Sequence, residues 1–404
     1  MFTLYYKQRS FRLYNRGSEK SMKRALIITT VSGFVPQFEM NNVKILQNLG
    51  YEVHYAANYH MPVYTDNNER LEGTGIIQHQ IDFVRSPYNI GKNIKALNQL
   101  VSLMRETKFH LVHCHTPMGG VLGRIAAHKT NTKPVIYTAH GFHFYKGAPV
   151  WNWLFFYPVE RFLAKWTDCL ITINKEDYKR AKEFIVHTSS SLFYIPGIGI
   201  RVSAYKKRGF EKKKKRNSLN IPQDTFLLIS IGELSKRKNH STIIKALAKC
   251  ENTNIHYIIC GSGMLEKRLR NLVHKYQLDK RVHFLGYRTD IQELLACSDC
   301  FIFPSFQEGL PVALMEAMVE GLPVICSSVR GNLDLIVDGK NGYTCEPTDI
   351  MTFSKIIDYL SVNKFLNLKL GIESQKRILP FSEENVINKM KYIYEVVKNK
   401  NLEI

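Results

Sequence analysis

The chain has 404 residues, which is enough for two domains with separate hydrophobic cores. Hydrophobic residues make up 45% of it and charged residues 23%, a balance that excludes a disordered chain and a fibrous protein. No window holds the ~18 consecutive apolar residues that a membrane-spanning helix requires. The net charge of +21 favours anionic partners such as nucleic acid, phospholipid or phosphorylated substrates.

The cysteines and the first residues both predict a cytoplasmic protein. Eight cysteines are scattered through the chain, most of them in apolar, strand-like runs, as expected for reduced and buried thiols. The pair Cys297 and Cys300 lacks the second half of a zinc-binding pattern, so we expect neither a metal nor a redox role for it. Residues 1–21 are basic without an apolar core segment, which predicts a disordered extension rather than a signal peptide.

From Met22 onward, short β-branched runs alternate with longer stretches of helical periodicity. This alternation predicts βαβ units around a parallel sheet, whose buried strands are continuously apolar. We expect strands over 25–30, 52–57, 109–114, 134–138, 168–173 and 192–195, and helices over 37–50, 91–107, 119–128, 151–165 and 175–185. They predict a first Rossmann-like domain over residues 22–197.

The alternation stops at the Pro- and Gly-containing segment 194–199, and a basic run follows it. Lys206 to Arg208 and Lys212 to Arg216 are interpreted as an exposed surface segment. Few aromatic residues are interleaved with this run, so we expect no nucleic-acid partner. Attraction to an anionic membrane leaflet stays open as an alternative to simple solvation.

A second alternation predicts a second Rossmann-like domain over residues 198–381. We expect strands over 225–231, 254–260, 282–285, 299–304 and 323–326, and helices over 240–249, 264–277, 290–297 and 311–320. The predicted fold class is therefore α/β, with two Rossmann-like domains facing each other across a cleft.

The most informative segment runs from Phe303 to Ala317, where a strand ends, a polar loop follows and Pro311 is placed as the first residue of a helix. Free N–H groups of that first turn predict a phosphate site. Glu308 and Glu316 are eight residues apart, which places them on about the same helical side, ~12 Å apart. This spacing suits two hydroxyl groups of one elongated ligand. The alternative is one glutamate that stabilises the helix dipole and one that is solvated.

The two glutamates stand in an E-G-L-P-x-x-x-x-E frame that resembles the donor-site signature of the retaining GT-B glycosyltransferases of family 4. The resemblance extends over nearly the whole chain from Met22. It implies the GT-B fold, with the donor nucleotide sugar held by the second domain and the acceptor by the first. It also implies that Gly309, Leu310 and Pro311 lie beside the donor.

The loop from Gly232 to Asn239 resembles the G-R-L-x-x-x-K-N loop of the family, whose arginine and lysine hold the donor diphosphate. Lys238 matches the lysine, but Glu233 stands at the arginine position. We therefore expect Lys236 or Arg237 to supply the missing charge.

The segment from Tyr137 to Pro149 is similar to the one that holds the active-site histidine, and most similar to the exopolysaccharide and capsule branch of the family, the EpsD- and CapM-like enzymes. His140 directly follows a predicted strand, at the edge where open α/β sheets bind ligands. A lone histidine is otherwise most often structural. His143 and the pair His113 and His115 have no comparable match, so we expect core or rim roles for them.

Weaker matches complete the implied donor site. Gly33 follows the first strand and matches the family's glycine loop, where backbone approaches phosphate closely. Gly286 and Tyr287 resemble the strand end that reads the uracil base through its backbone groups. The turn at Gly261 and Gly263 matches as well, and it could equally be a plain connection.

The resemblance implies a retaining transferase that moves a sugar, expected to be an N-acetylhexosamine, from a UDP-sugar to a lipid-linked saccharide. Its catalytic residues would be His140, which orients the sugar, and Glu308, which holds sugar hydroxyls. Lys238 would bind the diphosphate and Glu316 the ribose, with no protein nucleophile and no required metal. The alternatives are a non-hydrolysing UDP-sugar 2-epimerase and a non-catalytic, basic nucleic-acid-binding protein.

Residues 144–166 crowd three tryptophans and several phenylalanines beside His140. We expect peripheral binding to the cytoplasmic face of the cell membrane, where this segment would present a polyprenyl-diphosphate-linked sugar. The alternative is an amphipathic helix that covers the sheet. Residues 382–404 have an apolar stripe at helical spacing, and the resemblance implies that this last helix returns to the first domain.

Overall fold

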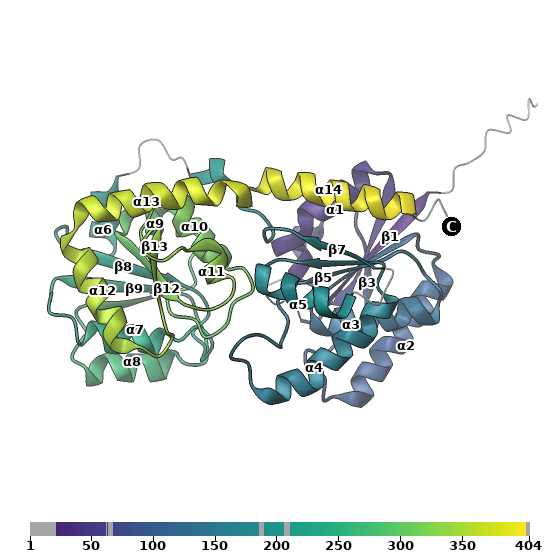
Figure 1. The fold of residues 1–404 in the computed structure, drawn as a ribbon, viewed down its shortest axis with the longest axis horizontal. Coiled ribbons are helices and arrows are strands. Elements are labelled where there is room, and N and C mark those ends of the chain that lie inside the picture. The colour runs from purple at the N-terminus through teal and green to yellow at the C-terminus, as the bar shows by residue number, and fades with distance from the viewer. Residues whose placement is uncertain (1–21, 62, 64–67, 186–189, 206–210, 401–404) are drawn as a thin grey trace, which may run out of the picture.

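The computed structural model describes residues 22–61, 63, 68–185, 190–205 and 211–400, which form two α/β domains side by side (Figure 1). Each domain is built on one fully parallel sheet with helices on both faces. The predicted fold class is confirmed. The basic extension 1–21 and the run Lys206 to Arg208 lie outside the described residues.

The first domain has a seven-stranded sheet in the order β3-β2-β1-β4-β5-β6-β7. Its strands are β1 (Lys23–Val31), β2 (Tyr51–Asn58), β3 (Ile77–Gln80), β4 (Leu111–His115), β5 (Val135–Ala139), β6 (Cys169–Thr172) and β7 (Ser191–Tyr194). Its helices are the π-helix η1 (Val35–Glu39), α1 (Met40–Asn48), η2 (Glu69–Leu71), α2 (Ile90–Glu106), α3 (Pro117–Lys129), α4 (Val150–Leu163), η3 (Ala164–Trp166) and α5 (Lys175–Ile185).

The second domain has a six-stranded sheet in the order β10-β9-β8-β11-β12-β13. Its strands are β8 (Phe226–Ile231), β9 (Ile255–Cys260), β10 (Val282–Gly286), β11 (Cys300–Phe303), β12 (Val324–Ser327) and β13 (Gly342–Cys345). Its helices are α6 (Lys212–Ser218), α7 (His240–Leu247), α8 (Glu266–Lys275), α9 (Ile291–Cys297), α10 (Val312–Glu320), α11 (Asn332–Leu335), α12 (Ile350–Val362) and α13 (Lys364–Ile378). The short helices η4 (Val202–Tyr205) and η5 (Leu379–Phe381) flank this domain.

The strand order of each sheet creates a binding crevice. In both sheets the order reverses beside the first strand, between β1 and β4 and between β8 and β11. Ligands of open α/β sheets bind at such a reversal, beyond the carboxyl ends of the strands. Those are the strand ends that carry His140 in the first domain and Glu308 in the second.

Most strands follow from their apolar sequences: residues 25–31 of β1 are all buried and pair with both β2 and β4. The edge strand β3 was not predicted, because its sequence Ile-Gln-His-Gln is mostly polar and its side chains are largely exposed. The eight cysteines are all unpaired, and all but Cys250 are buried.

The basic run Lys212 to Arg216 is exposed, as its sequence predicts, only at Lys213 and Lys214. It forms most of α6, and Arg216 is buried with only 3% of its surface exposed. Its guanidinium donates to the carbonyls of Cys297 and Thr225 and to the Asp299 carboxylate. Because Cys297 and Asp299 lie far away in the sequence, the run itself contains no sign of which basic side chain is buried.

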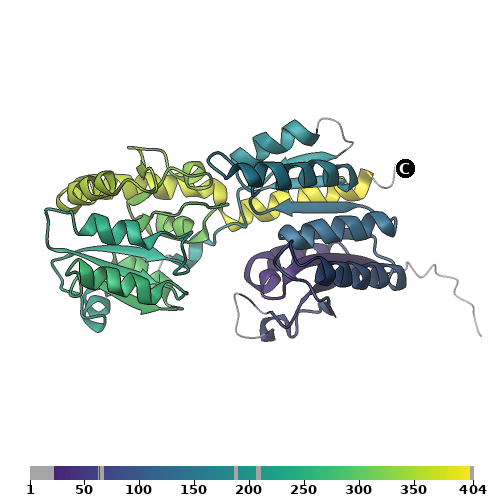
Figure 2. The ribbon, with the colours of Figure 1, turned by 90° about the horizontal axis from the view of Figure 1, so that it is seen from below.

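The last helix, α14 (Glu383–Lys400), leaves the second domain and lies along the first, as two views show (Figures 1 and 2). Met390, Ile393 and Tyr394 are buried, and the Tyr394 hydroxyl is 2.8 Å from Nδ1 of His113. Tyr392, which the helical spacing of apolar residues also places in the stripe, is not buried and is 60% exposed. In the described part of the chain, no helix has the length and apolar character needed to cross a bilayer.

Replacing Met390 by alanine tests how strongly α14 is bound. Met390 is 1% exposed, so Met390→Ala should lower the free energy of unfolding by about 2–5 kcal/mol through lost apolar contact and a cavity. Its exposed neighbour is the matched control, and Lys391→Ala should change stability by less than about 0.5 kcal/mol. Denaturant titration followed by circular dichroism measures both, and equal effects would contradict the buried position of Met390.

Candidate functional site

A cavity of about 870 Å³ lies where the two domains face each other. The second domain contributes Arg237, Gln307, Glu308, Gly309 and Arg330 to its wall. The first domain contributes His140, Gly141 and His143, together with side chains of α2, α3 and α4 that are mainly apolar. The cavity therefore has a charged end and an apolar end, and His140 belongs to the wall between them.

The charged end is built around Glu308, which lies in the loop between β11 and α10 and is buried. Its Oε1 accepts from Nζ of Lys238 at 2.7 Å and from Nη1 of Arg237 at 3.0 Å. Burial lowers the pKa of Lys238, and the adjacent Glu308 carboxylate opposes that shift. Arg237 thus brings a second cation to the site, whereas Glu233 of the same loop is exposed.

The expected helical relation of the two glutamates does not hold, because Glu308 precedes the helix. Pro311 is the N-cap and α10 begins at Val312, one residue later than predicted. The loop, not the helix period, therefore directs the Glu308 side chain. Glu316 points elsewhere, and its Oε1 accepts from the hydroxyl of Tyr205 at 2.7 Å. Burial raises the pKa of Glu316, and the Tyr205 hydrogen bond opposes that shift.

His140 and the Glu308 loop meet across the domain boundary. A Cβ atom on Gly309 would lie 2.2 Å from the backbone oxygen of His140, so only glycine permits this approach. The structure thus brings together the predicted residues of both domains. Leu310 is buried and packs against Gly197, where the chain passes from the first domain to the second.

Arg330, which sequence reasoning missed, joins the two domains from inside. It is 5% exposed, and its Nη1 donates to Oδ1 of Asp177 at 2.6 Å. The same guanidinium donates to the backbone oxygens of Phe142 and Glu308. Its place shortly after β12 could have revealed it, because the ends of parallel strands line the crevice.

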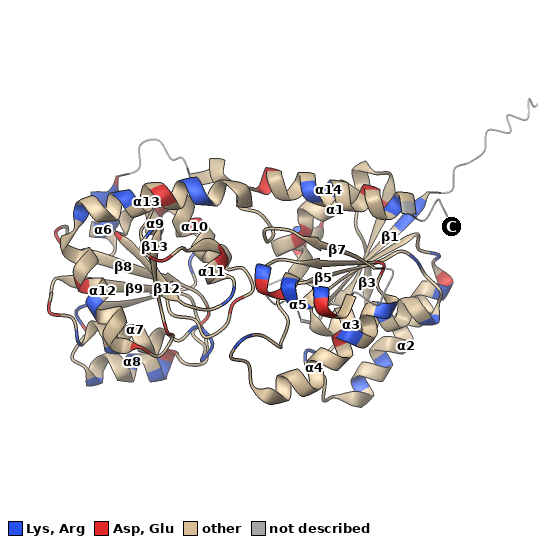
Figure 3. Cartoon of the chain, viewed as in Figure 1, with Lys and Arg blue, Asp and Glu red and all other residues tan. Residues whose placement is uncertain are grey.

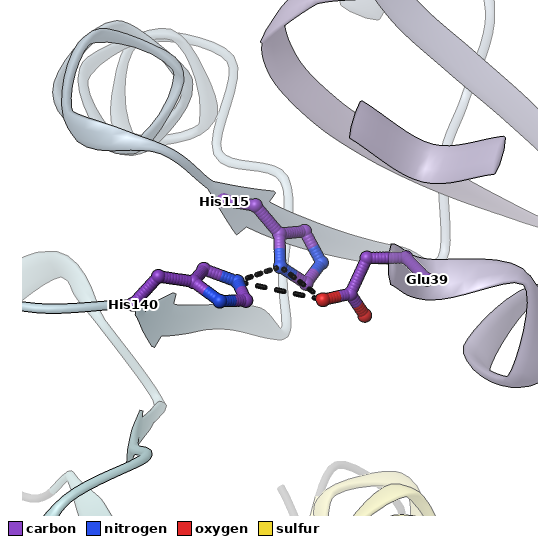
Figure 4. A group of neighbouring side chains, drawn as sticks. All are labelled: Glu39, His115 and His140. Atoms are coloured by element: carbon purple, nitrogen blue, oxygen red, sulfur yellow. Dashed lines mark hydrogen bonds and ion pairs between the residues drawn. The ribbon is translucent and has the colours of Figure 1, made fainter. Parts of the chain in front are cut away.

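Behind His140 lies a buried cluster of Glu39, His115 and His140, shown in Figure 4. His115 is the last residue of β4, His140 directly follows β5, and Glu39 is the last residue of the π-helix. Burial raises the pKa of Glu39 to about 8, and an Asn42 hydrogen bond opposes the shift. Burial lowers the pKa of His140 to about 4 and that of His115 well below its usual range. Burial therefore disfavours the charged form of each of the three groups.

The other histidines are structural or at the rim. His113 is a core residue, held between the hydroxyls of Tyr394 and Thr138. His143 borders the cavity and stacks on Phe156, with ring centroids 4.6 Å apart. His115 is also a core residue with no exposed surface, as expected, and its Nδ1 lies 3.1 Å from Nε2 of His140.

The weaker predicted donor residues, Gly33, Gly286 and Tyr287, are not among the residues that line the cavity. Gly33 is buried in the turn after β1, and its neighbour Phe34 packs edge-on against the His140 ring. Gly286 ends the edge strand β10, and its carbonyl accepts from the backbone of Gly261 at 2.7 Å. Tyr287 is 77% exposed.

Comparisons with known proteins agree over both domains. Residues 25–174 match the family described as "Glycosyl transferase 4-like", and residues 211–377 match "Glycosyl transferases group 1". EpsD of Bacillus subtilis (strain 168), named as a glycosyltransferase, is 35% identical over 92% of this chain and 96% of its own. The chain belongs to the group 1 glycosyltransferases. It is therefore a transferase, and the 2-epimerase alternative is not supported.

Two further similarities bear on this glycosyltransferase. The UDP-Gal:alpha-D-GlcNAc-diphosphoundecaprenol alpha-1,3-galactosyltransferase of Escherichia coli is 28% identical over 91% of this chain and 95% of its own. The structure of Anabaena Alr3699/HepE in complex with UDP and glucose has a TM-score of 0.75 at 19% identity, and the match covers 93% of this chain and all of that one. The structural match shows that the two share the GT-B fold.

Replacing Arg330 by alanine tests the junction between the domains. Arg330→Ala should lower the free energy of unfolding by about 3–5 kcal/mol, because it leaves the Asp177 carboxylate buried without its cation. The matched control is Arg201→Ala, which removes an exposed ion pair with Glu383 and should cost less than about 1 kcal/mol. Denaturant unfolding measures the free energy of unfolding of both variants. Equal losses would show that the buried pair of Arg330 stabilises the protein no more than the exposed pair of Arg201.

Proposed function

We propose that this glycosyltransferase moves an N-acetylhexosamine from a UDP-sugar to a polyprenyl-diphosphate-linked saccharide in exopolysaccharide or capsule synthesis. The anomeric configuration is retained and no metal is required. One observation carries the proposal: a single cavity joins a cationic end at Glu308 to an apolar end between α2 and α4. The names of two relatives, EpsD and the diphosphoundecaprenol-directed galactosyltransferase, support it. So does the UDP in the structure of HepE.

The charged end suits a nucleotide diphosphate. Lys238 and Arg237 both contact Glu308, and the N-terminus of α10 lies three residues beyond Gly309. A diphosphate that binds here would be attracted by two cations and by the free N–H groups of the helix. It would also release Glu308 from its ion pairs, so that this carboxylate can accept hydrogen bonds from sugar hydroxyls. Glu316 would then exchange the Tyr205 hydroxyl for a ribose hydroxyl.

Sugar transfer depends more on stabilisation of the departing diphosphate than on a basic side chain of the protein. As the sugar–phosphate bond breaks, negative charge grows on the phosphate oxygens beside Lys238, and fixed cations lower the barrier most at that point. The acceptor hydroxyl attacks from the face that the diphosphate leaves, which retains the configuration, and a phosphate oxygen takes its proton. His140 orients the sugar from the opposite side of the cleft.

The apolar end suits a prenyl chain and opens toward an apolar surface. One face of α4 packs on the core through the partly buried Trp153, Phe156 and Tyr157. Its other face exposes six apolar side chains at helical spacing: Val150, Trp151, Leu154, Phe155, Val159 and Phe162. The first turns of this helix are free of charge, whereas basic residues lie nearby (Figure 3). The helix can therefore cover the sheet and bind a membrane at the same time. One face packs on the core, and the other is free to enter the interfacial layer of a bilayer.

Two substitutions test the donor site. Glu308→Gln and Lys238→Ala should each lower turnover more than about tenfold with the fold intact, since such an electrostatic contact is worth ~3 kcal/mol in the transition state. The control Glu233→Gln changes an exposed carboxylate in the Lys238 loop and should leave turnover unchanged. Transfer from UDP-N-acetylhexosamine to a prenyl-diphosphate-linked sugar is measured with a chelator present. Normal turnover in both site variants would contradict the proposed donor site.

Liposome flotation tests the membrane surface. Trp151→Glu and Leu154→Glu should lower recovery with anionic vesicles about tenfold or more, because each removes an apolar side chain worth ~1.5–3 kcal/mol when buried. Phe365→Glu is the control, since Phe365 is 83% exposed but lies on α13 of the other domain. Binding should also weaken at high salt, which shortens the range of charge attraction to ~3 Å at 1 M. Equal recovery of all variants, or no binding at low salt, would refute the membrane interface.

A further inference from the structure

The cluster behind His140 holds three metal-ligating atoms around one point. Nδ1 of His115 lies 3.1 Å from Nε2 of His140 and 3.6 Å from Oε1 of Glu39, and Nε2 of His140 lies 3.4 Å from that same oxygen. Both contacts to the carboxylate are longer than a normal N–H···O hydrogen bond. Figure 4 shows the two ring nitrogens and the oxygen turned toward the space between them.

We infer that Glu39, His115 and His140 bind a divalent transition-metal ion, with Zn²⁺ as the best fit. A triangle with these three sides has a centre about 2.0 Å from each corner, which equals the usual Zn–N and Zn–O bond lengths of ~2.0–2.2 Å. Three such ligands of a tetrahedral zinc ion stand about 3.3 Å apart. Two imidazoles and one carboxylate are also a zinc-type ligand set, whereas Mg²⁺ prefers oxygen atoms alone.

The surroundings of the cluster support a built site. Asn42 donates a hydrogen bond to Oε2 of Glu39, which leaves Oε1 to face the histidines. Glu39 and His115 are 3% and 0% exposed, so their positions are fixed by packing. Glu39 also ends a five-residue π-helix, and π-helical turns are rare and often occur at functional sites.

The fourth coordination position would be open toward the cleft. The side chain of His140 is 20% exposed and borders both the large cavity and a small one beside α14. A bound ion would use the Nε2 lone pair of His140 and fix the orientation of its ring at the wall of the cavity. The site lies in the first domain, apart from the cations at Glu308, and it does not depend on the proposed donor or acceptor.

Metal titration of the full-length protein tests the inference without any assay of transfer. Chelator-treated protein is titrated with Zn²⁺ against a competing zinc indicator, and we expect one tightly bound ion per chain. Glu39→Gln and His140→Gln should each weaken this binding at least about tenfold. His283→Gln is the matched control, because His283 and His256 form a pair with ring nitrogens 3.0 Å apart in the second domain.

Circular dichroism confirms the fold of each variant, and Co²⁺ gives a reading on the unmodified protein. Co²⁺ bound by this cluster should show the visible absorption of a four-coordinate site, and Zn²⁺ should abolish it. Absence of tight Zn²⁺ binding would overturn the inference. So would binding that survives both cluster variants, or binding that is lost only in His283→Gln.

Discussion

A buried ion pair between Arg330 and Asp177 determines how the two domains meet. Both groups are buried, with Arg330 5% and Asp177 0% exposed, so the carboxylate oxygens and the guanidinium N–H groups need partners inside the protein. Asp177 is held by Asn174 and by the backbone of Phe142, and Arg330 binds the backbone of Glu308. The pair therefore connects the segment after His140 to the loop that carries Glu308. A displacement of either domain would leave buried charge without a partner.

The close contact between the two domains explains why the site contains Gly309 and a carboxylate paired with cations. Gly309 allows the Glu308 loop to approach the His140 carbonyl, and a larger residue would separate the domains. Within the loop, Glu308 is balanced by Lys238 and Arg237, and Glu316 by the Tyr205 hydroxyl. Lys238 and Glu316 already contact groups of the kind that the donor would supply, a carboxylate and a hydroxyl respectively. Donor binding thus exchanges contacts within a preformed site, and little reorganisation is needed.

Local sequence patterns predicted the sheets and the residues at strand ends, and tertiary contacts determined the rest. Buried strands were recognised because apolar runs of β-branched residues have few alternatives in a parallel sheet. His140, Glu308 and Lys238 could be found because the segments that follow such strands resemble motifs of the family. Glu39 could not, since the π-helix shifts its side chain out of the 3.6-residue period. The burial of Arg216 was equally hidden, because its partners come from distant parts of the chain.

The apolar face of α4 supports the proposal that the acceptor is linked to a lipid. Large exposed apolar patches are unfavourable for a chain that stays in water, and they usually mark a surface that meets a partner. Here the patch belongs to the helix that also contributes Phe155, Phe156 and Val159 to the wall of the cavity. A lipid-linked acceptor would pass from such a surface along α4 to His140 without crossing water. A water-soluble acceptor would need only the charged end of the cavity, and it would not explain the exposed apolar face of α4. The position of α4 therefore favours a lipid-linked acceptor.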